Sequence, residues 1–310
     1  MNRHLAIIFV PLIAAVVVGS ASGTLQAVND LDVRLAGYPQ LTIRLTEERI
    51  EAPVYAPAGR TLLVEENALD ESGHAFVLRV PDDVADEDVT EALTGDSLVQ
   101  EIPEWFWRAE FLGNGDHAAP DQTAVSLVDL APGRYLAGDP FRPRNEFARF
   151  EVIKDFDLQV QASPFIGADM TLELFEMGFE MPKTIRAGRY LWEVENSGAM
   201  LHEFAILPVP AGASKGDVET AAAAMLAVEM SGDTTEARAT MDALGAAWAS
   251  WSGEAVAGMG LLSPQHTSVV QIALEPGTYG IVCYVPEPVS GTPHLMLGMS
   301  DVFTVAGATS

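Results

Sequence analysis

Four residues in the second half of the chain carry side chains that bind soft transition metals. The single cysteine, Cys283, is followed by His294 and Met299, and His202 lies well upstream. Two imidazoles and a thiolate, with a weak thioether, form the ligand set of blue copper sites, because soft sulfur atoms suit Cu(I) and imidazoles suit both oxidation states. The ordered set therefore predicts a site for one copper ion that exchanges single electrons.

Each of these residues also has an ordinary structural explanation. A lone buried cysteine packs as a small hydrophobic residue, and a methionine fills irregular gaps in a core. A histidine often satisfies a backbone carbonyl. A cysteine and two histidines also bind zinc, although a methionine as the fourth ligand favours copper. The metal interpretation therefore depends on the four residues occurring together, in this order.

The segments around these residues predict β-strands, because they alternate apolar and polar side chains between Pro and Gly turns. His202 follows "WEVENSG", Cys283 ends "GTYGIVC", and both His294 and Met299 precede "DVFTV". In a β-sandwich, one histidine on an inner strand and three ligands between the last two strands form such a site most simply. We interpret the preceding Pro276-Gly277 turn as a hairpin-type connection.

One sequence pattern occurs twice along the chain. The segment 41–67, "LTIRLTEERIEAPVYAPAGRTLLVEEN", matches 170–196, "MTLELFEMGFEMPKTIRAGRYLWEVEN", and "LAPGRY" later matches "LEPGTY". Two copies are too few for a solenoid, so they predict two related antiparallel β-sandwiches. After the strand of His202, the C-terminal copy has an Ala-rich helical insert, for which Ser214 and Asp233 are predicted N-caps.

The N-terminal copy lacks most of the predicted ligand set. His74 matches His202, but Asp139 stands in the place of Cys283, and the closing loop contains no His or Met. We therefore expect this copy to bind no copper, and the alternative is a weaker metal site formed by His74, His117 and Asp139. Because the fold forms without the thiol in one copy, Cys283 in the other is better explained as a ligand.

The motifs "ENSGAMLHEF", "PGTYGIVC" and "PHLMLGM" resemble those of the cupredoxins, the family that includes plastocyanin and azurin. The resemblance implies an all-β chain of two tandem cupredoxin-like Greek-key β-sandwiches, the second with a short helical insert. It implies His202, Cys283 and His294 as equatorial copper ligands and Met299 as the axial ligand. It also implies that electrons enter through His294, with its imidazole edge at the surface. The interval from Cys283 to His294 is longer than in plastocyanin and resembles that of copper nitrite reductases.

The N-terminus has the pattern of a signal peptide over residues 1–23, with Arg3 before an apolar run and small residues after it. An uncleaved N-terminal anchor is the alternative. We then expect a cupredoxin-like domain without copper ligands at 24–155 and a copper-binding domain at 156–310, with no membrane span after signal cleavage. The predicted location is the periplasm, the cell surface or the medium.

The charge of the chain bears on its partners. Its net charge is −27, from 44 acidic and 17 basic residues. This balance argues against nucleic acid and favours a basic redox partner protein. The chain has six histidines, with no His-x-His pair and none beside Cys283, so we expect no second copper centre and a protein that is not an enzyme. Copper sequestration or delivery, and a β-sandwich interaction module without metal, are the rival hypotheses.

Overall fold

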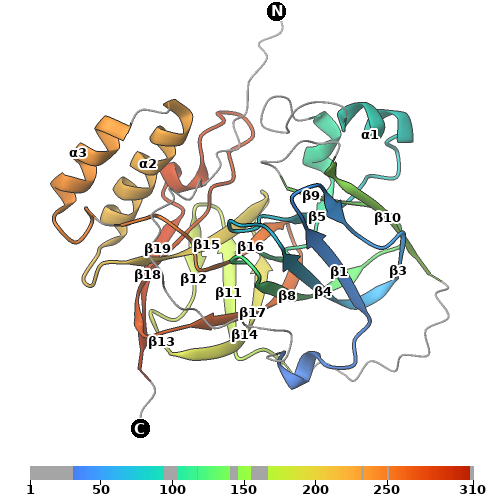
Figure 1. The fold of residues 1–310 in the computed structure, drawn as a ribbon, viewed down its shortest axis with the longest axis horizontal. Helices are drawn as coiled ribbons and strands as arrows, with labels where there is room; N and C mark the ends of the chain where they lie inside the picture. The colour runs from blue at the N-terminus through green and yellow to red at the C-terminus, as the bar shows by residue number, and fades with distance from the viewer. Residues whose placement is uncertain are drawn as a thin grey trace, which may run out of the picture.

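The structure is a computed structural model in which the chain is mostly β-strand (Figure 1). The described residues are 31–93, 103–116, 118–139, 146–154, 167–231, 234–249 and 251–307. The predicted signal peptide, His117, Asp233 and the predicted boundary at 155–156 lie outside them. Within the described part, no helix is long and apolar enough to cross a membrane.

One sheet of eight strands runs through both copies. In spatial order its strands are β12 (Gly178–Glu180), β11 (Met170–Phe175), β14 (Gly188–Asn196), β17 (Thr267–Leu274), β8 (Thr123–Leu130), β4 (Gly59–Asn67), β1 (Gln40–Leu45) and β2 (Ile50–Glu51). The copies meet where β17 pairs with β8, with Val269 opposite Leu127. Strand β1 shows why these segments form strands, since Leu41, Ile43 and Leu45 are buried and alternate with polar residues.

A second sheet faces each half of the shared sheet. In the N-terminal copy it consists of β3 (Tyr55–Pro57), β10 (Ala148–Ile153), β9 (Gly133–Gly138), β5 (Phe76–Arg79) and β6 (Glu110–Phe111). In the C-terminal copy it consists of β13 (Thr184–Arg186), β19 (Ser300–Ala306), β18 (Gly277–Val282), β15 (His202–Val209), β16 (Ala257–Leu262) and β7 (Gly115–Asp116). Because β7 comes from the N-terminal copy, the two copies interlock. The largest apolar cluster also joins them and includes Cys283 and Met299.

The prediction of an all-β, cupredoxin-like fold is confirmed, but two details of the prediction are wrong. The sheets are mixed rather than antiparallel, because β1 pairs with β4 and β11 with β14 in parallel. The intervening β3 and β13 belong to the facing sheets, so the chain crosses the sandwich and returns in its original direction. Pro276-Gly277 is not a hairpin turn, because it leads from β17 in one sheet to β18 in the other. The hydroxyl of Tyr279 donates to the carbonyl of Glu275 at 2.9 Å and closes this corner.

The predicted helical insert is present and consists of α2 (Lys215–Ser231) and α3 (Thr234–Leu244). These helices lie at one end of the molecule, and α1 (Asp86–Ala92) lies at the other (Figure 1). Ser214 caps α2 as predicted, since its Oγ accepts from the Asp217 N–H at 3.2 Å and the Asp217 carboxylate accepts from the Ser214 N–H at 2.8 Å. The insert covers the outer face of the sheet that carries the predicted ligands.

Candidate metal centre

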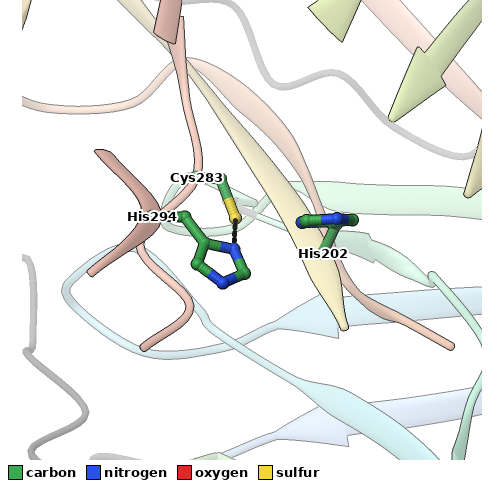
Figure 2. Close-up of side chains that lie close together, drawn as sticks. All are labelled: His202, Cys283 and His294. Carbon is green, nitrogen blue, oxygen red and sulfur yellow. Dashed lines mark hydrogen bonds between the residues drawn. The ribbon is translucent and has the colours of Figure 1, made fainter. Parts of the chain in front are cut away.

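Three of the predicted ligands meet at the ends of neighbouring strands. His202 is the first residue of β15, and Cys283 directly follows β18, which pairs with β15. His294 begins the short 3-10 helix η5 (His294–Leu297). Figure 2 shows the sulfur of Cys283 joined by a dashed line to the ring of His294, with the imidazole of His202 beside them. The strand pairing therefore brings together residues that are distant in sequence.

The three side chains have the separation that a shared metal ion requires. One ligand atom from each of His202, Cys283 and His294 lies within 4.8 Å of the others. The Sγ of Cys283 lies 3.6 Å from the Nδ1 of His294. Metal–sulfur and metal–nitrogen bonds of about 2.3 and 2.1 Å that meet at about 110° place their ligand atoms about 3.6 Å apart. The residues therefore fit one ion.

The burial of the cluster supports a metal-binding role. All three side chains have an exposed fraction of 0%. Both ring nitrogens of His202 and the Nε2 of His294 have no hydrogen-bond partner among the described residues. A buried polar group left unpaired costs about 1–3 kcal/mol, so a core histidine normally finds a partner. Coordination of a metal would satisfy a nitrogen on each ring.

The protonation states also suit metal binding. Burial lowers the pKa of His202 to about 4, with a further contribution from His294, and burial lowers the pKa of His294 to about 4. Both imidazoles are therefore neutral at pH 7, the form that binds metals. Burial raises the pKa of the Cys283 thiol, while the backbone N–H groups of Glu203 and Val285 lower it. The thiol is therefore protonated without metal, and a metal ion must displace its proton.

The long interval between Cys283 and His294 forms a narrow hairpin. The His294 N–H donates to the Val285 carbonyl at 2.9 Å, and the Leu295 N–H donates to the Cys283 carbonyl at 2.8 Å. At the far end, Glu287 donates its N–H to the carbonyl of Thr292 at 2.9 Å. The extra residues thus project away from the cluster, and the two ligands stay adjacent despite the loop length.

Met299 is buried next to the cluster, with an exposed fraction of 0%. Its N–H donates to the His294 carbonyl at 2.8 Å, and its carbonyl accepts from the Cys283 N–H at 3.2 Å. Gly298, at φ +99°, supplies the left-handed turn that leads from η5 to Met299. The backbone of Met299 is therefore held against two of the predicted ligands.

The prediction that the imidazole edge of His294 reaches the surface is wrong. Its ring points inward, toward the Cys283 sulfur, and is fully buried. The residues that η5 exposes are Met296 and Leu297, with exposed fractions of 56% and 42%. Electron exchange with a partner would therefore have to cross protein atoms that cover His294.

The N-terminal copy has no comparable cluster among the residues that the structure describes. Asp139 is buried and His74 is partly buried, but the alternative site also needs His117, which is not described. Sequence reasoning missed Gly198, where an added Cβ atom would contact the Nε2 of His202, and Glu176, whose Oε1 borders the same space. Glu176 belongs to none of the ligand motifs. Gly198 lies within "ENSGAMLHEF", where only His202 was assigned a role, and its mismatch with Leu69 in the other copy was the available signal.

Comparisons with known proteins are limited to structure, since no protein-family pattern and no curated protein matches the chain. The chain is similar to dithionite-reduced auracyanin of the photosynthetic bacterium Roseiflexus castenholzii, with a TM-score of 0.27 and 18% identity over 45% of this chain and 99% of that one. It is also similar to a multicopper oxidase, with a TM-score of 0.21 and 10% identity over 87% of this chain and 88% of that one. A third similar structure is the copper-containing nitrite reductase of Thermus scotoductus SA-01, with a TM-score of 0.20 and 10% identity over 87% of this chain and 61% of that one.

The fold and the cluster together define a cupredoxin-like protein. The paired β-sandwiches agree with the predicted resemblance, and the His-Cys-His arrangement fits a type 1 copper site. A copper-binding redox protein is the class that these features indicate.

The prediction that the protein is not an enzyme is contradicted. Among the similar structures, a multicopper oxidase and a nitrite reductase, each similar over 87% of this chain, are enzymes. The six histidines are those of one chain, whereas a metal shared between copies of a symmetric oligomer takes ligands from more than one chain. The histidine count therefore does not exclude catalysis.

Proposed function

We propose that this chain is an exported protein with one type 1 copper, through which it transfers one electron at a time. The observation that carries the proposal is the buried cluster of three ligand atoms within 4.8 Å of one another. In this proposal His202, Cys283 and His294 are the equatorial ligands and Met299 is the axial ligand. Copper, when bound, supplies the change between Cu(I) and Cu(II).

The protein's own contribution is a rigid and dry ligand set. His202 and Cys283 lie at the ends of paired strands, and backbone hydrogen bonds fix His294 and Met299 against Cys283. Leu295, with an exposed fraction of 1%, helps to keep water away. Ligands that move little between the two oxidation states make electron transfer easier, and an apolar surround tunes the reduction potential.

Burial also favours electron transfer over copper delivery. A delivery protein passes its metal to another protein by ligand exchange, for which at least one ligand must be reached from outside. His202, Cys283 and His294 all have an exposed fraction of 0%. A buried site suits an ion that stays in place while electrons cross the cover.

The remaining predictions belong to the same proposal. The copper-binding domain would span 156–310, and the domain at 24–155 would serve as scaffold or docking surface. With a net charge of −27, the partner would be a basic redox protein rather than nucleic acid. The signal segment 1–23 would direct the protein to the periplasm, the cell surface or the medium.

Voltammetry of the copper-loaded protein, combined with a transfer assay to a Cu(I) chelator, tests this function. We expect a reversible one-electron wave and a copper release that is slow compared with electron exchange. Copper that leaves the protein on reduction, without a reversible wave, would instead establish a delivery role. Zinc-loaded protein is the control, since zinc has no redox chemistry.

A further inference from the structure

Three polar atoms near the metal centre surround a small space beside Gly198. A Cβ atom added at Gly198 would lie 2.8 Å from the Oε1 of Glu176, 3.1 Å from the Nε2 of His202 and 3.2 Å from the Oδ1 of Asn196. The Nε2 of His202 therefore faces two oxygen acceptors across a space that any side chain at position 198 would fill. This nitrogen is buried and has no hydrogen-bond partner among the described residues.

The N-terminal copy shows that this turn does not need glycine for its backbone. There the Asn67 Oδ1 accepts from the Leu69 N–H at 2.9 Å, as the Asn196 Oδ1 accepts from the Gly198 N–H at 3.0 Å. The two turns are thus equivalent, but the N-terminal one carries a buried leucine. Glycine stands at this position only in the copy with the cysteine, so its role there is to leave space.

Glu176 is held over this space. It lies in the tight turn between β11 and β12, where Phe175 pairs with Gly178. Its Oε1 accepts a hydrogen bond from the N–H of Ala199, the residue next to Gly198. The carboxylate also raises the pKa of His202, which burial lowers more strongly. Glu176 is exposed to solvent, so its carboxylate lies between the solvent and the imidazole of His202.

We propose that Glu176 is a positioning residue of the metal centre, which accepts the Nε2–H of His202 through one bridging water beside Gly198. This hydrogen bond selects the tautomer in which Nδ1 is free to bind the metal, and it fixes the orientation of the ring. The negative charge also favours Cu(II) over Cu(I), so it lowers the reduction potential. The consequences for bound copper rest on the proposed function, whereas the tautomer is a property of the metal-free protein.

Four variants test this role: E176Q, E176D, G198A and, as the matched control, E47Q at the equivalent position of the N-terminal copy. In the metal-free protein at pH 7, ¹⁵N NMR should show His202 protonated at Nε2 in the wild type and in E47Q. We expect a mixture of tautomers in E176Q. In G198A, where the added methyl displaces the ring, we expect copper affinity to fall by about 10–100-fold. After copper loading, E176Q should have a higher reduction potential than E47Q, and E176D should recover part of the difference.

The outcomes separate this inference from the proposed function. If E176Q keeps the wild-type tautomer and the wild-type potential while the visible copper–thiolate band is normal, the inference is wrong and the function stands. If the wild type forms no such band, the proposed function fails, and the tautomer of the metal-free protein still decides the role of Glu176. Circular dichroism of each variant confirms that the fold is retained.

Discussion

The sulfur of Cys283 faces the Nδ1 of His294 at 3.6 Å, although the two residues are 11 positions apart in the sequence. The contact exists because the intervening residues fold back on themselves, and the backbone of Leu295 hydrogen-bonds to Cys283 itself. The loop is therefore long, but the distance between Cys283 and His294 is determined by the backbone hydrogen bonds where the loop begins and ends. This relationship underlies the first two predictions.

Shortening the hairpin should leave the metal centre intact. Replacing residues 287–292 by Asn-Gly keeps the bridge between Pro286 and Pro293 and the hydrogen bond from His294 to Val285. We expect copper affinity and the visible spectrum to match those of the wild type, as measured by titration. A lost or shifted spectrum would mean that the tip of the hairpin, and not its base, positions His294.

Copper should stabilise the folded protein, because the ligand cluster is assembled only in the folded state. At a free copper concentration of about 100 times Kd, the free energy of unfolding should rise by about 2.7 kcal/mol. The increase should disappear in Cys283→Ala. Chemical denaturation with and without Cu(II) measures this difference. An equal increase in both proteins would place the bound copper elsewhere.

Met299→Leu tests the axial ligand. Loss of the axial ligand lowers the coordination number of the metal, which Cu(I) tolerates better than Cu(II). The variant should therefore have a higher reduction potential while the copper–thiolate band persists. Met241→Leu, at a buried position in α3, is the matched control and should leave the potential unchanged. If Met299→Leu has the same reduction potential as Met241→Leu and the wild type, the Met299 sulfur does not reach the metal.

The contact between Glu110 and His266 should make stability depend on pH. The Nε2 of His266 lies 3.1 Å from the Glu110 Oε1, and the contact joins the two copies. The hydrogen bond to His266 lowers the pKa of Glu110 below 4.5, and the hydrogen bond to Glu110 raises the pKa of His266 above 6.5. Glu110 thus stabilises the fold above its unfolded pKa and loses this effect as pH falls. His266 stabilises it below its unfolded pKa and loses this effect as pH rises.

The pair therefore contributes most between about pH 4.5 and 6.5. We expect His266→Asn to reduce the free energy of unfolding more at pH 5.5 than at pH 8. The extra loss should be under about 1 kcal/mol, because both side chains are partly exposed. Urea denaturation at the two pH values measures it, with Glu110→Gln as the partner variant in a double-mutant cycle. A loss that is equal at both pH values would contradict this ion pair.

The ligand residues could be predicted because metal chemistry restricts residue type, and because the repeat supplied a copy of the fold without Cys283. The strands could be predicted because apolar and polar residues alternate in segments such as 40–45. The pairing of β17 with β8 could not, because a strand's own sequence does not identify its neighbour in a sheet. Pro276-Gly277 indicated a connection between two strands, but a turn signal does not tell whether those strands pair or belong to two different sheets.

The burial of His294 and the role of Gly198 were also beyond the sequence. Whether an imidazole is covered depends on the path of a loop, which length alone does not determine. A glycine at a position where the other copy has leucine shows that space is needed, but only the folded chain places the Nε2 of His202 against that space.

Titration of the metal-free protein with Cu(II), followed by visible spectroscopy, tests the central claim most directly. The wild type should bind one copper per chain and develop an intense copper–thiolate charge-transfer band that disappears on reduction and returns on oxidation. Cys283→Ala should develop no such band. The same band in Cys283→Ala, or its absence from the wild type, would contradict the assignment of His202, Cys283 and His294 as a type 1 copper site.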